Sequence, residues 1–194
     1  MLISNLLKKF RRDTDGTITV EFVIIAPVLL FLLALGFQFF DAFKSYSRAA
    51  KATYAMADIV SREEAPIDDQ FNAKLHGLLE SLLPWIQDDK AIRMTSIKWD
   101  QNVEDYAVEW SCSVNGENAA LDFYAYSNLT TETLTSDQKE KLPDLVPGDS
   151  VVFVETHIPY SALFDYIGLG ELVWENQVAI RPRFTSEVVL DGTC

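Results

Sequence analysis

Glu21 is the residue that most needs a chemical explanation, because it stands directly before a long apolar run. The run extends from Phe22 to Phe40 without a formal charge and is rich in Leu, Phe, Ile, Val and Ala. At about 1.5 Å per residue, a helix of this length nearly crosses the roughly 30 Å hydrocarbon core of a membrane. Ionisable groups within membrane spans are rare and usually functional. The Glu21 carboxylate at the edge of the run therefore requires either a stabilising interaction or a functional role.

Two interpretations of Glu21 follow from the residues alone. In the first, the helix dipole stabilises the carboxylate, which near the first turn gains roughly 0.3–1 kcal/mol. In the second, the chain is cut between Gly16 and Thr17, and the new terminal ammonium lies four residues before Glu21 on the same helix face. An ammonium on one subunit and Glu21 on a neighbour then offset each other's desolvation and fix the register of packed helices. Residue physics alone favours the first interpretation.

A family resemblance favours the second interpretation. A basic leader that ends in Gly, a Glu four positions after the next residue and an uninterrupted apolar helix resemble the class III signal of type IV prepilins. The segment 8–62 is similar to the TadE-like pseudopilins of tight-adherence (Tad) pilus systems, through Gly16-Thr17-Ile18-Thr19-Val20-Glu21-Phe22 and the Pro27 that follows. The resemblance implies that a prepilin peptidase cuts the Gly16–Thr17 bond and that Glu21 is the signal glutamate. Because major pilins are much shorter, it also implies a minor, accessory subunit.

The charge is distributed unevenly along the chain. Residues 1–16 contain four basic and two acidic residues, a net charge of +2, and because the whole chain carries −13, the remainder carries −15. By the positive-inside rule, this asymmetry predicts a single-pass protein with a cytoplasmic N-terminus and a C-terminal domain outside the cytoplasm. The resemblance implies that the membrane is the inner membrane and that the domain is periplasmic or exported with the pilus. An acidic remainder also argues against nucleic-acid binding, which requires a clustered basic face.

A cleaved secretory signal peptide is the competing interpretation of the N-terminus. Such a peptide has a shorter apolar core and small residues at its cleavage site. Here the run is long and ends in the bulky segment 37–40, whereas the small triplet Ala55-Met56-Ala57 lies too far beyond it. We therefore expect the apolar segment to be retained as a membrane span.

The helix is predicted to continue beyond the membrane. The absence of Pro and Gly from Phe37 to Ala65 and the alanine-rich composition favour one helix over residues 17–62, with its transmembrane half at 22–40. A stripe of aromatic and alanine residues recurs at three- and four-residue intervals along the outer half. Its candidates for packing on a sheet or on another subunit are Phe43, Tyr46, Ala50 and Tyr54.

Residues 63–194 are predicted to form one exported α+β domain. A second helix is expected over 67–83, because apolar residues recur at helical intervals before Pro84, and a short helix is expected near 136–141. Strands are expected from Ile92, over 106–114, over 151–158 and over 172–180. Two helices followed by strands indicate an antiparallel sheet with the long helix packed on it, a pilin-like arrangement.

Two details of the strands are also predicted. The spacing between Met94 and Ile97 departs from strict alternation, which suggests a bulge. The even-numbered residues from Tyr106 to Val114 alternate with polar residues, which predicts that they share one face of the sheet. Asn115-Gly116 is a turn signal after that strand.

Few residues of the exported domain indicate chemistry. Cys112 and Cys194 are candidates for one disulfide in an oxidising compartment, with two unrelated thiols as the alternative. His76 and His157 have no ligand at metal-binding spacing, and no nucleophile motif or phosphate-binding glycine loop occurs. We therefore expect no catalytic residue, no metal and no cofactor.

Three hypotheses of function remain. The first is a minor pseudopilin or assembly subunit of an adhesive Tad pilus, whose partners are the prepilin peptidase, other Tad pseudopilins, pilus assembly proteins and the lipid bilayer. The alternative is a signal-anchored periplasmic binding domain of unknown ligand, which would not be processed. A tethered periplasmic hydrolase has the least support, because no catalytic motif is recognisable.

Overall fold

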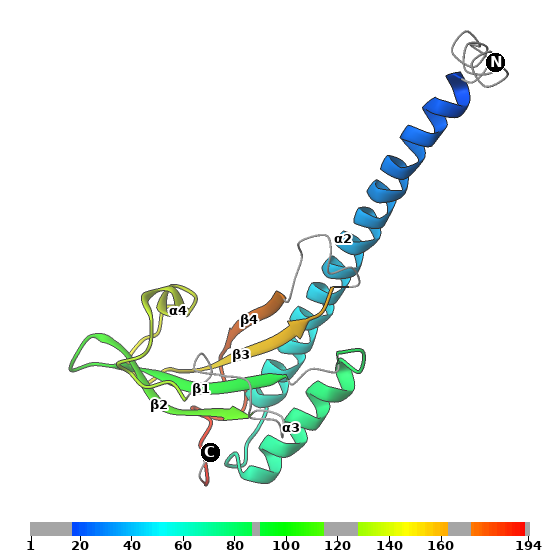
Figure 1. Cartoon of the computed structure of the whole chain (residues 1–194). Coiled ribbons are helices and arrows are strands. Elements are labelled where there is room, and N and C mark those ends of the chain that lie inside the picture. Colours follow the sequence, from blue (N-terminus) through cyan, green and yellow to red (C-terminus); the bar gives the residue numbers. More distant parts are fainter. Residues whose placement is uncertain (1–16, 87–89, 115–127, 163–171, 193–194) are drawn as a thin grey trace, which may run out of the picture. The chain divides into compact units, whose positions relative to one another are not determined.

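The computed structural model describes residues 17–86, 90–114, 128–162 and 172–192. The chain divides into two compact units, Met1–Asp41 and Ala42–Cys194, and each is described by itself (Figure 1). The predicted α+β class is confirmed. The elements are α2 (Thr17–Ser61), α3 (Asp69–Leu82), β1 (Ala91–Asp100), β2 (Asp105–Val114), α4 (Ser136–Glu140), β3 (Ser150–Tyr160) and β4 (Leu172–Ile180).

Helix α2 is continuous through Pro27 and extends from the first unit into the second. Its end is marked by Ser61, whose hydroxyl donates to the carbonyl of Asp58 at 2.8 Å, so that a side chain satisfies one of the last carbonyls of the helix. The predicted single helix over 17–62 is thus observed over Thr17–Ser61.

Helix α3 begins where a side chain caps it. The Asp68 carboxylate accepts a hydrogen bond from the Phe71 N–H at 2.7 Å, which supplies an acceptor for one of the orphan N–H groups of the first turn. The helix ends at Leu82, two residues before Pro84, which lacks an N–H and cannot continue a helix. Leu75 and Leu79 of this helix are buried.

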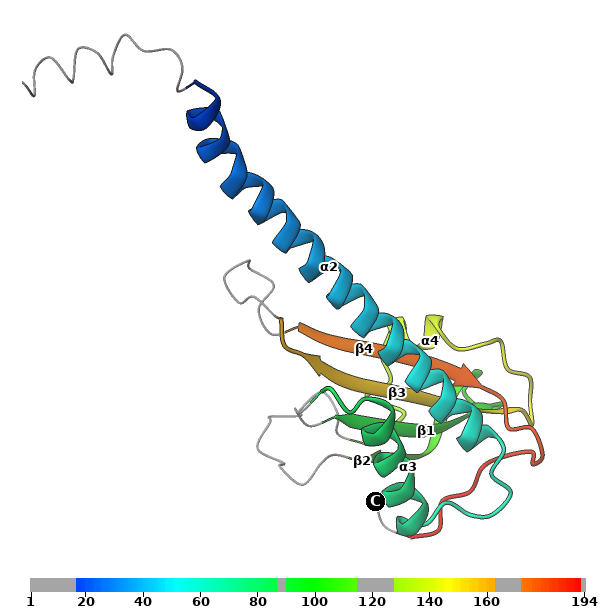
Figure 2. The same cartoon turned by 90° about the vertical axis from the view of Figure 1, so that its right-hand side faces the viewer.

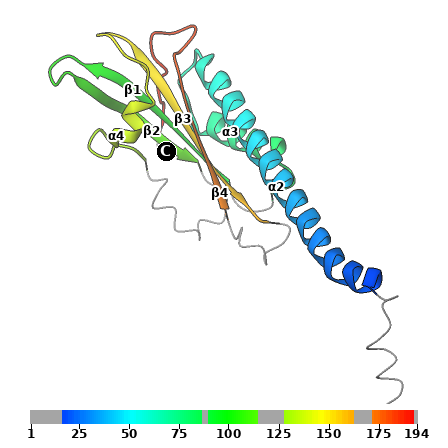
Figure 3. The ribbon, with the colours of Figure 1, turned by 90° about the horizontal axis from the view of Figure 1, so that it is seen from above.

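The four strands form one antiparallel sheet in the order β2-β1-β3-β4. Within the second unit, the outer half of α2 and helix α3 cover one face of the sheet, and α4 lies on the other face (Figures 2 and 3). The helix-side core combines Met56 and Val60 of α2, Leu75 and Leu79 of α3, and apolar residues of the strands such as Met94. Trp174, Val178 and Ile180 of β4 pack against this core.

The predicted irregularity of the sheet is present, but it lies in β2. Ser96 pairs with Trp110 and the next residue, Ile97, pairs with Val108, so Glu109 is the extra residue of a β-bulge. Strand β1 itself alternates regularly, because Ile97 packs on the face opposite to Met94.

The bulge corrects the prediction that Tyr106 to Val114 share one face. Trp110, Cys112 and Val114 belong to the helix-side core, whereas Tyr106 and Val108 pack against the core on the opposite face. Apolar and polar residues still alternate along the sequence on both sides of the bulge. The one inserted residue, however, turns the apolar side chains before it toward the opposite face of the sheet from those after it.

The second face of the sheet is covered by the segment 128–149. Its buried leucines, Leu129, Leu134, Leu142 and Leu145, pack against Ile97, Val151 and Phe153. Helix α4 is closed by a capping box in which Thr135 and Gln138 bond reciprocally. Side chains of this segment also satisfy the outer edge of β2: Asn128 accepts from the Ser113 N–H, and Thr131 accepts from the Val108 N–H.

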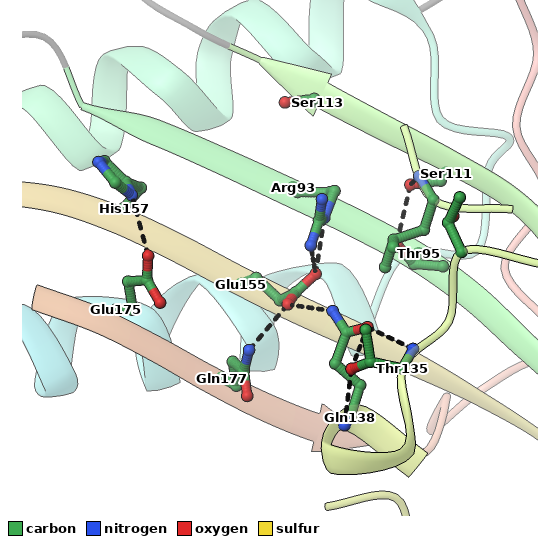
Figure 4. A network of polar contacts seen from close by, with 12 residues as sticks. Arg93, Thr95, Ser111, Ser113, Thr135, Gln138, Glu155, His157, Glu175 and Gln177 are labelled. Atoms are coloured by element: carbon green, nitrogen blue, oxygen red, sulfur yellow. Dashed lines mark hydrogen bonds and ion pairs between the residues drawn. The ribbon is translucent and has the colours of Figure 1, made fainter. Parts of the chain in front are cut away.

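A buried carboxylate ties α4 to three strands on this face. Figure 4 shows Arg93, Gln138 and Gln177 pointing toward Glu155. The Arg93 Nε donates to Glu155 at 2.6 Å, and the amides of Gln138 and Gln177 each donate to its other oxygen at 3.0 Å. Arg93 and Glu155 are 5% and 1% exposed, so this charge pair is removed from water and depends on its hydrogen bonds.

His157 lies farther along β3 on the same face (Figure 4). Its Nδ1 is 3.5 Å from a carboxylate oxygen of Glu175 on β4. Burial lowers the pKa of His157 below its ordinary value, and the attraction of Glu175 offsets only part of that effect. The folded chain therefore favours the neutral imidazole.

Replacing Glu155 by Ala is expected to destabilise the domain strongly. The change leaves the Arg93 guanidinium buried without its carboxylate, which typically costs about 3–5 kcal/mol. Urea unfolding of the full chain in detergent measures the loss, with Glu132→Ala as the matched control because Glu132 is an exposed carboxylate of the same covering segment. Equal unfolding midpoints for the two variants would contradict the proposed importance of the buried pair.

Acidification is expected to weaken the fold through His157. The unfolded histidine binds a proton near pH 6.5, whereas the folded one resists protonation because its pKa is lower. The contribution of His157 to the free energy of unfolding is therefore complete above about pH 6.5 and is lost as the pH falls toward the folded pKa. The His157→Gln variant should lose less free energy of unfolding than the wild type between pH 7.5 and pH 5. Parallel curves for the two proteins would show that His157 does not contribute.

Candidate functional site

The N-terminal half of α2 presents its large apolar side chains outward. Between Ile18 and Phe40, Val, Leu, Ile and Phe side chains are exposed along the helix, and the most apolar window has a mean hydropathy of 2.7 with none of its residues buried. Such exposure of contiguous apolar surface requires a non-aqueous partner. The helix is long and apolar enough to cross a membrane, a property that N-terminal signal sequences share.

The residues of the predicted processing signal lie at the start of this helix. Gly16 is outside the described residues, Thr17 is the first residue of α2, and Glu21 follows one turn later with an exposed side chain. The predicted roles of these three residues depend on a cut chain and on a second subunit, and they remain predictions.

The outer half of α2 contacts the sheet through small residues. Ala49, Ala52 and Ala57 are buried at 4% exposure or less, and short side chains allow a helix to approach a sheet closely. At this contact the Thr53 hydroxyl is 2.6 Å from the Thr156 hydroxyl of β3, so a buried hydrogen bond joins helix and sheet. The Thr53 hydroxyl also donates to the Ala49 carbonyl at 3.0 Å.

The predicted packing residues divide between different sides of α2. Phe43 and Tyr54 are 71% and 64% exposed, on the side of the helix away from the sheet, and Ala50 is half-buried. Tyr46 lies at the edge of the contact. The sheet-facing role thus belongs mainly to alanine, Thr53 and Met56, whereas Phe43 and Tyr54 are available to a neighbouring molecule.

Aromatic residues flank the outer half of α2 on the β4 side. Tyr46 packs edge-on against Trp174 with ring centroids 5.5 Å apart, and Tyr160 lies 5.4 Å from the same indole. The Trp174 Nε1 donates to the Ser45 hydroxyl at 3.2 Å. Aromatic pairs of this kind stabilise beyond their buried area, so they fix β4 beside the helix.

A cation–π pair flanks the helix on the α3 side. The Arg48 guanidinium carbon lies 4.2 Å from the centroid of the Trp85 ring, which follows α3 and Pro84. Nothing in the sequence indicated this contact, because 36 intervening positions separate its partners along the chain and neither belongs to a recognisable motif.

The structure describes only one of the two cysteines of the predicted disulfide. The Cys112 sulfur accepts a hydrogen bond from the Asn72 amide at 3.3 Å, and Cys112 is not a free thiol. Cys194 lies outside the described residues, so the Cys112–Cys194 pairing remains a prediction. Among the described residues, no group of three His, Cys, Asp or Glu side chains could hold a metal ion.

Comparison with known proteins identifies the N-terminal helix. Residues 16–58 match the family model described as TadE-like protein. No curated protein and no solved structure matches the chain. The matched segment contains the predicted signal, the apolar half of α2 and most of the outer half that packs on the sheet. Residues 16–58 are therefore a TadE-like protein domain, of a family associated with Tad pilus assembly.

Proposed function

We propose that this chain is a minor pseudopilin, a structural subunit that assembles with a Tad-type adhesive pilus. The observation that carries the proposal is the division of α2 into two halves within one TadE-like segment. One half exposes apolar side chains and the other anchors a sheet domain. This arrangement suits a subunit that is stored in a membrane and displays its domain outside, and members of the family are structural proteins and not enzymes.

The proposed subunit is matured at its N-terminus. A prepilin peptidase removes residues 1–16 on the cytoplasmic side of the inner membrane, and Thr17 becomes the first residue. The ammonium so created lies one helical turn from Glu21 on the same helix. In the low dielectric of the membrane, an ammonium and a carboxylate from adjacent subunits stabilise each other.

The exposed side of the outer half of α2 provides a second subunit contact. Phe43 and Tyr54 are separated by about three helical turns, so they lie on nearly the same face. Their exposure leaves these two aromatic rings without a partner among the residues that the structure describes. A neighbouring pseudopilin or another Tad assembly protein is the proposed partner, and the two contacts together orient helices side by side.

Gly16→Ala is expected to prevent maturation. The peptidase in this family cuts after Gly, and a Cβ at that position obstructs the bond, so the variant should keep its leader and migrate at the size of the full chain. Immunoblotting of membranes that contain the peptidase measures this outcome. Gly36→Ala is the control, because a Cβ at Gly36 meets no atom within 4 Å and should leave processing intact. A Gly16→Ala chain that is cut normally would refute the assignment of the bond.

Glu21→Gln is expected to separate maturation from assembly. The variant should be cut like the wild type, but should co-purify far less with the other Tad pseudopilins after cross-linking, because the amide cannot neutralise a neighbour's ammonium. Glu64→Gln, which alters an exposed carboxylate beyond α2, should behave like the wild type. Undiminished co-purification of the cut Glu21→Gln chain would exclude the ion pair.

A further inference from the structure

Within the second unit, a rim of aromatic and basic side chains surrounds the first turns of the outer half of α2. The rim consists of Tyr46 and Arg48 of α2 and of Trp174 and Trp85, which contact them from the two flanks of the helix. We propose that this rim seats the exported domain on the anionic phospholipid headgroups of the membrane that α2 crosses. The inference rests on the proposed function only for the membrane span.

The α3 flank of the rim has the composition of an interfacial anchor. Trp85 is 45% exposed although Arg48 lies over its ring, and Leu78 and Leu82 continue the exposed apolar surface along α3. Tryptophan is enriched at membrane interfaces because its ring is amphipathic. Arginine buries its aliphatic stem and directs its guanidinium toward phosphate, which it binds through paired N–H groups.

The β4 flank repeats the pattern at the same level of α2. Tyr46 is partly exposed beside Trp174. The indole N–H of Trp174 donates to the Ser45 hydroxyl, which holds the ring against α2. Aromatic residues on both sides of one helix turn form a belt around it.

The charge of the rim opposes that of the rest of the domain. Residues 42–51 contain Lys44, Arg48 and Lys51 and no acidic residue, although the chain after residue 16 carries a net charge of −15. Basic residues directly after a span on its exported side also oppose the positive-inside rule, so their presence there calls for a local role. Each basic residue near an anionic bilayer contributes about 1 kcal/mol of attraction.

The rim is within reach of the headgroups. Arg48 follows Phe40, the end of the apolar run, by eight residues, or about 12 Å of helix. The polar zone on each side of a hydrocarbon core is roughly 5–8 Å thick. A long arginine side chain covers the remaining distance.

The test uses the full chain in lipid nanodiscs that contain a phosphatidylglycerol with brominated acyl chains. Bromine quenches tryptophan fluorescence only at short range, so the wild type should be quenched. Trp85→Phe should lose a large part of that quenching and keep the part that comes from Trp174, the other tryptophan of the rim. Trp99→Phe is the matched control, because Trp99 packs with Tyr106 in the core of the opposite sheet face and should retain the wild-type quenching. Each variant is first shown to have the wild-type unfolding midpoint.

A second pair of variants tests the charge. Arg48→Glu should reduce the quenching in phosphatidylglycerol and have little effect in phosphatidylcholine, whereas Lys74→Glu, a reversal at an exposed lysine farther along α3, should change neither. Equal bromolipid quenching in wild type and Trp85→Phe, or none in either, would overturn the proposal. Trp85 emission that shifts with protein-to-lipid ratio without bromine quenching would instead assign the rim to a second copy. Because these readouts need no cut at Gly16, they are independent of the pseudopilin assignment.

Discussion

The close contact between the outer half of α2 and the sheet is the constraint on which the rest of the structure depends. Ala49, Ala52 and Ala57 leave room for the helix to approach, and the Thr53–Thr156 hydrogen bond joins the two surfaces inside the core. Because α2 is continuous, this contact attaches the domain to the apolar segment that begins at Thr17. A larger side chain at any of these alanines would separate helix and sheet, and overpacking of this kind costs typically 1–3 kcal/mol.

One helix thus serves two different surroundings. Its first half places Leu, Ile, Val and Phe around the whole circumference, which is stable only in an apolar medium. Its second half has a side of small buried residues, a side of exposed aromatic residues and flanks where Tyr46 and Arg48 meet the domain. On the opposite face of the sheet, the hydrogen bond from Gln138 to Glu155 holds the covering segment 128–149 in place. One face of the sheet is thus covered by helices and the other mainly by this segment.

Much of this fold could be predicted from local periodicity, and the exceptions have physical reasons. The bounds of β4 follow from alternation, and the helical spacing of apolar residues before Pro84 gives α3 to within two residues at either end. The face change in β2 does not, since the bulge at Glu109 shows itself only in the pairing with β1. The Glu155 network unites side chains from β1, β3, β4 and α4, and no sequence spacing joins them. The stripe of aromatic and alanine residues did not show which of its members meet the sheet, because close approach of helix and sheet favours the small side chains and is set by packing.

The central claim is that the chain becomes a subunit by losing its leader, and the mature N-terminus tests it most directly. Intact-mass measurement and N-terminal sequencing of the wild-type chain, purified from membranes with and without the prepilin peptidase, give the result. The account predicts a chain that begins at Thr17 when the peptidase is present and at Met1 when it is absent. A chain that begins at Met1 in both membranes, or one cut after Ala57, would contradict it.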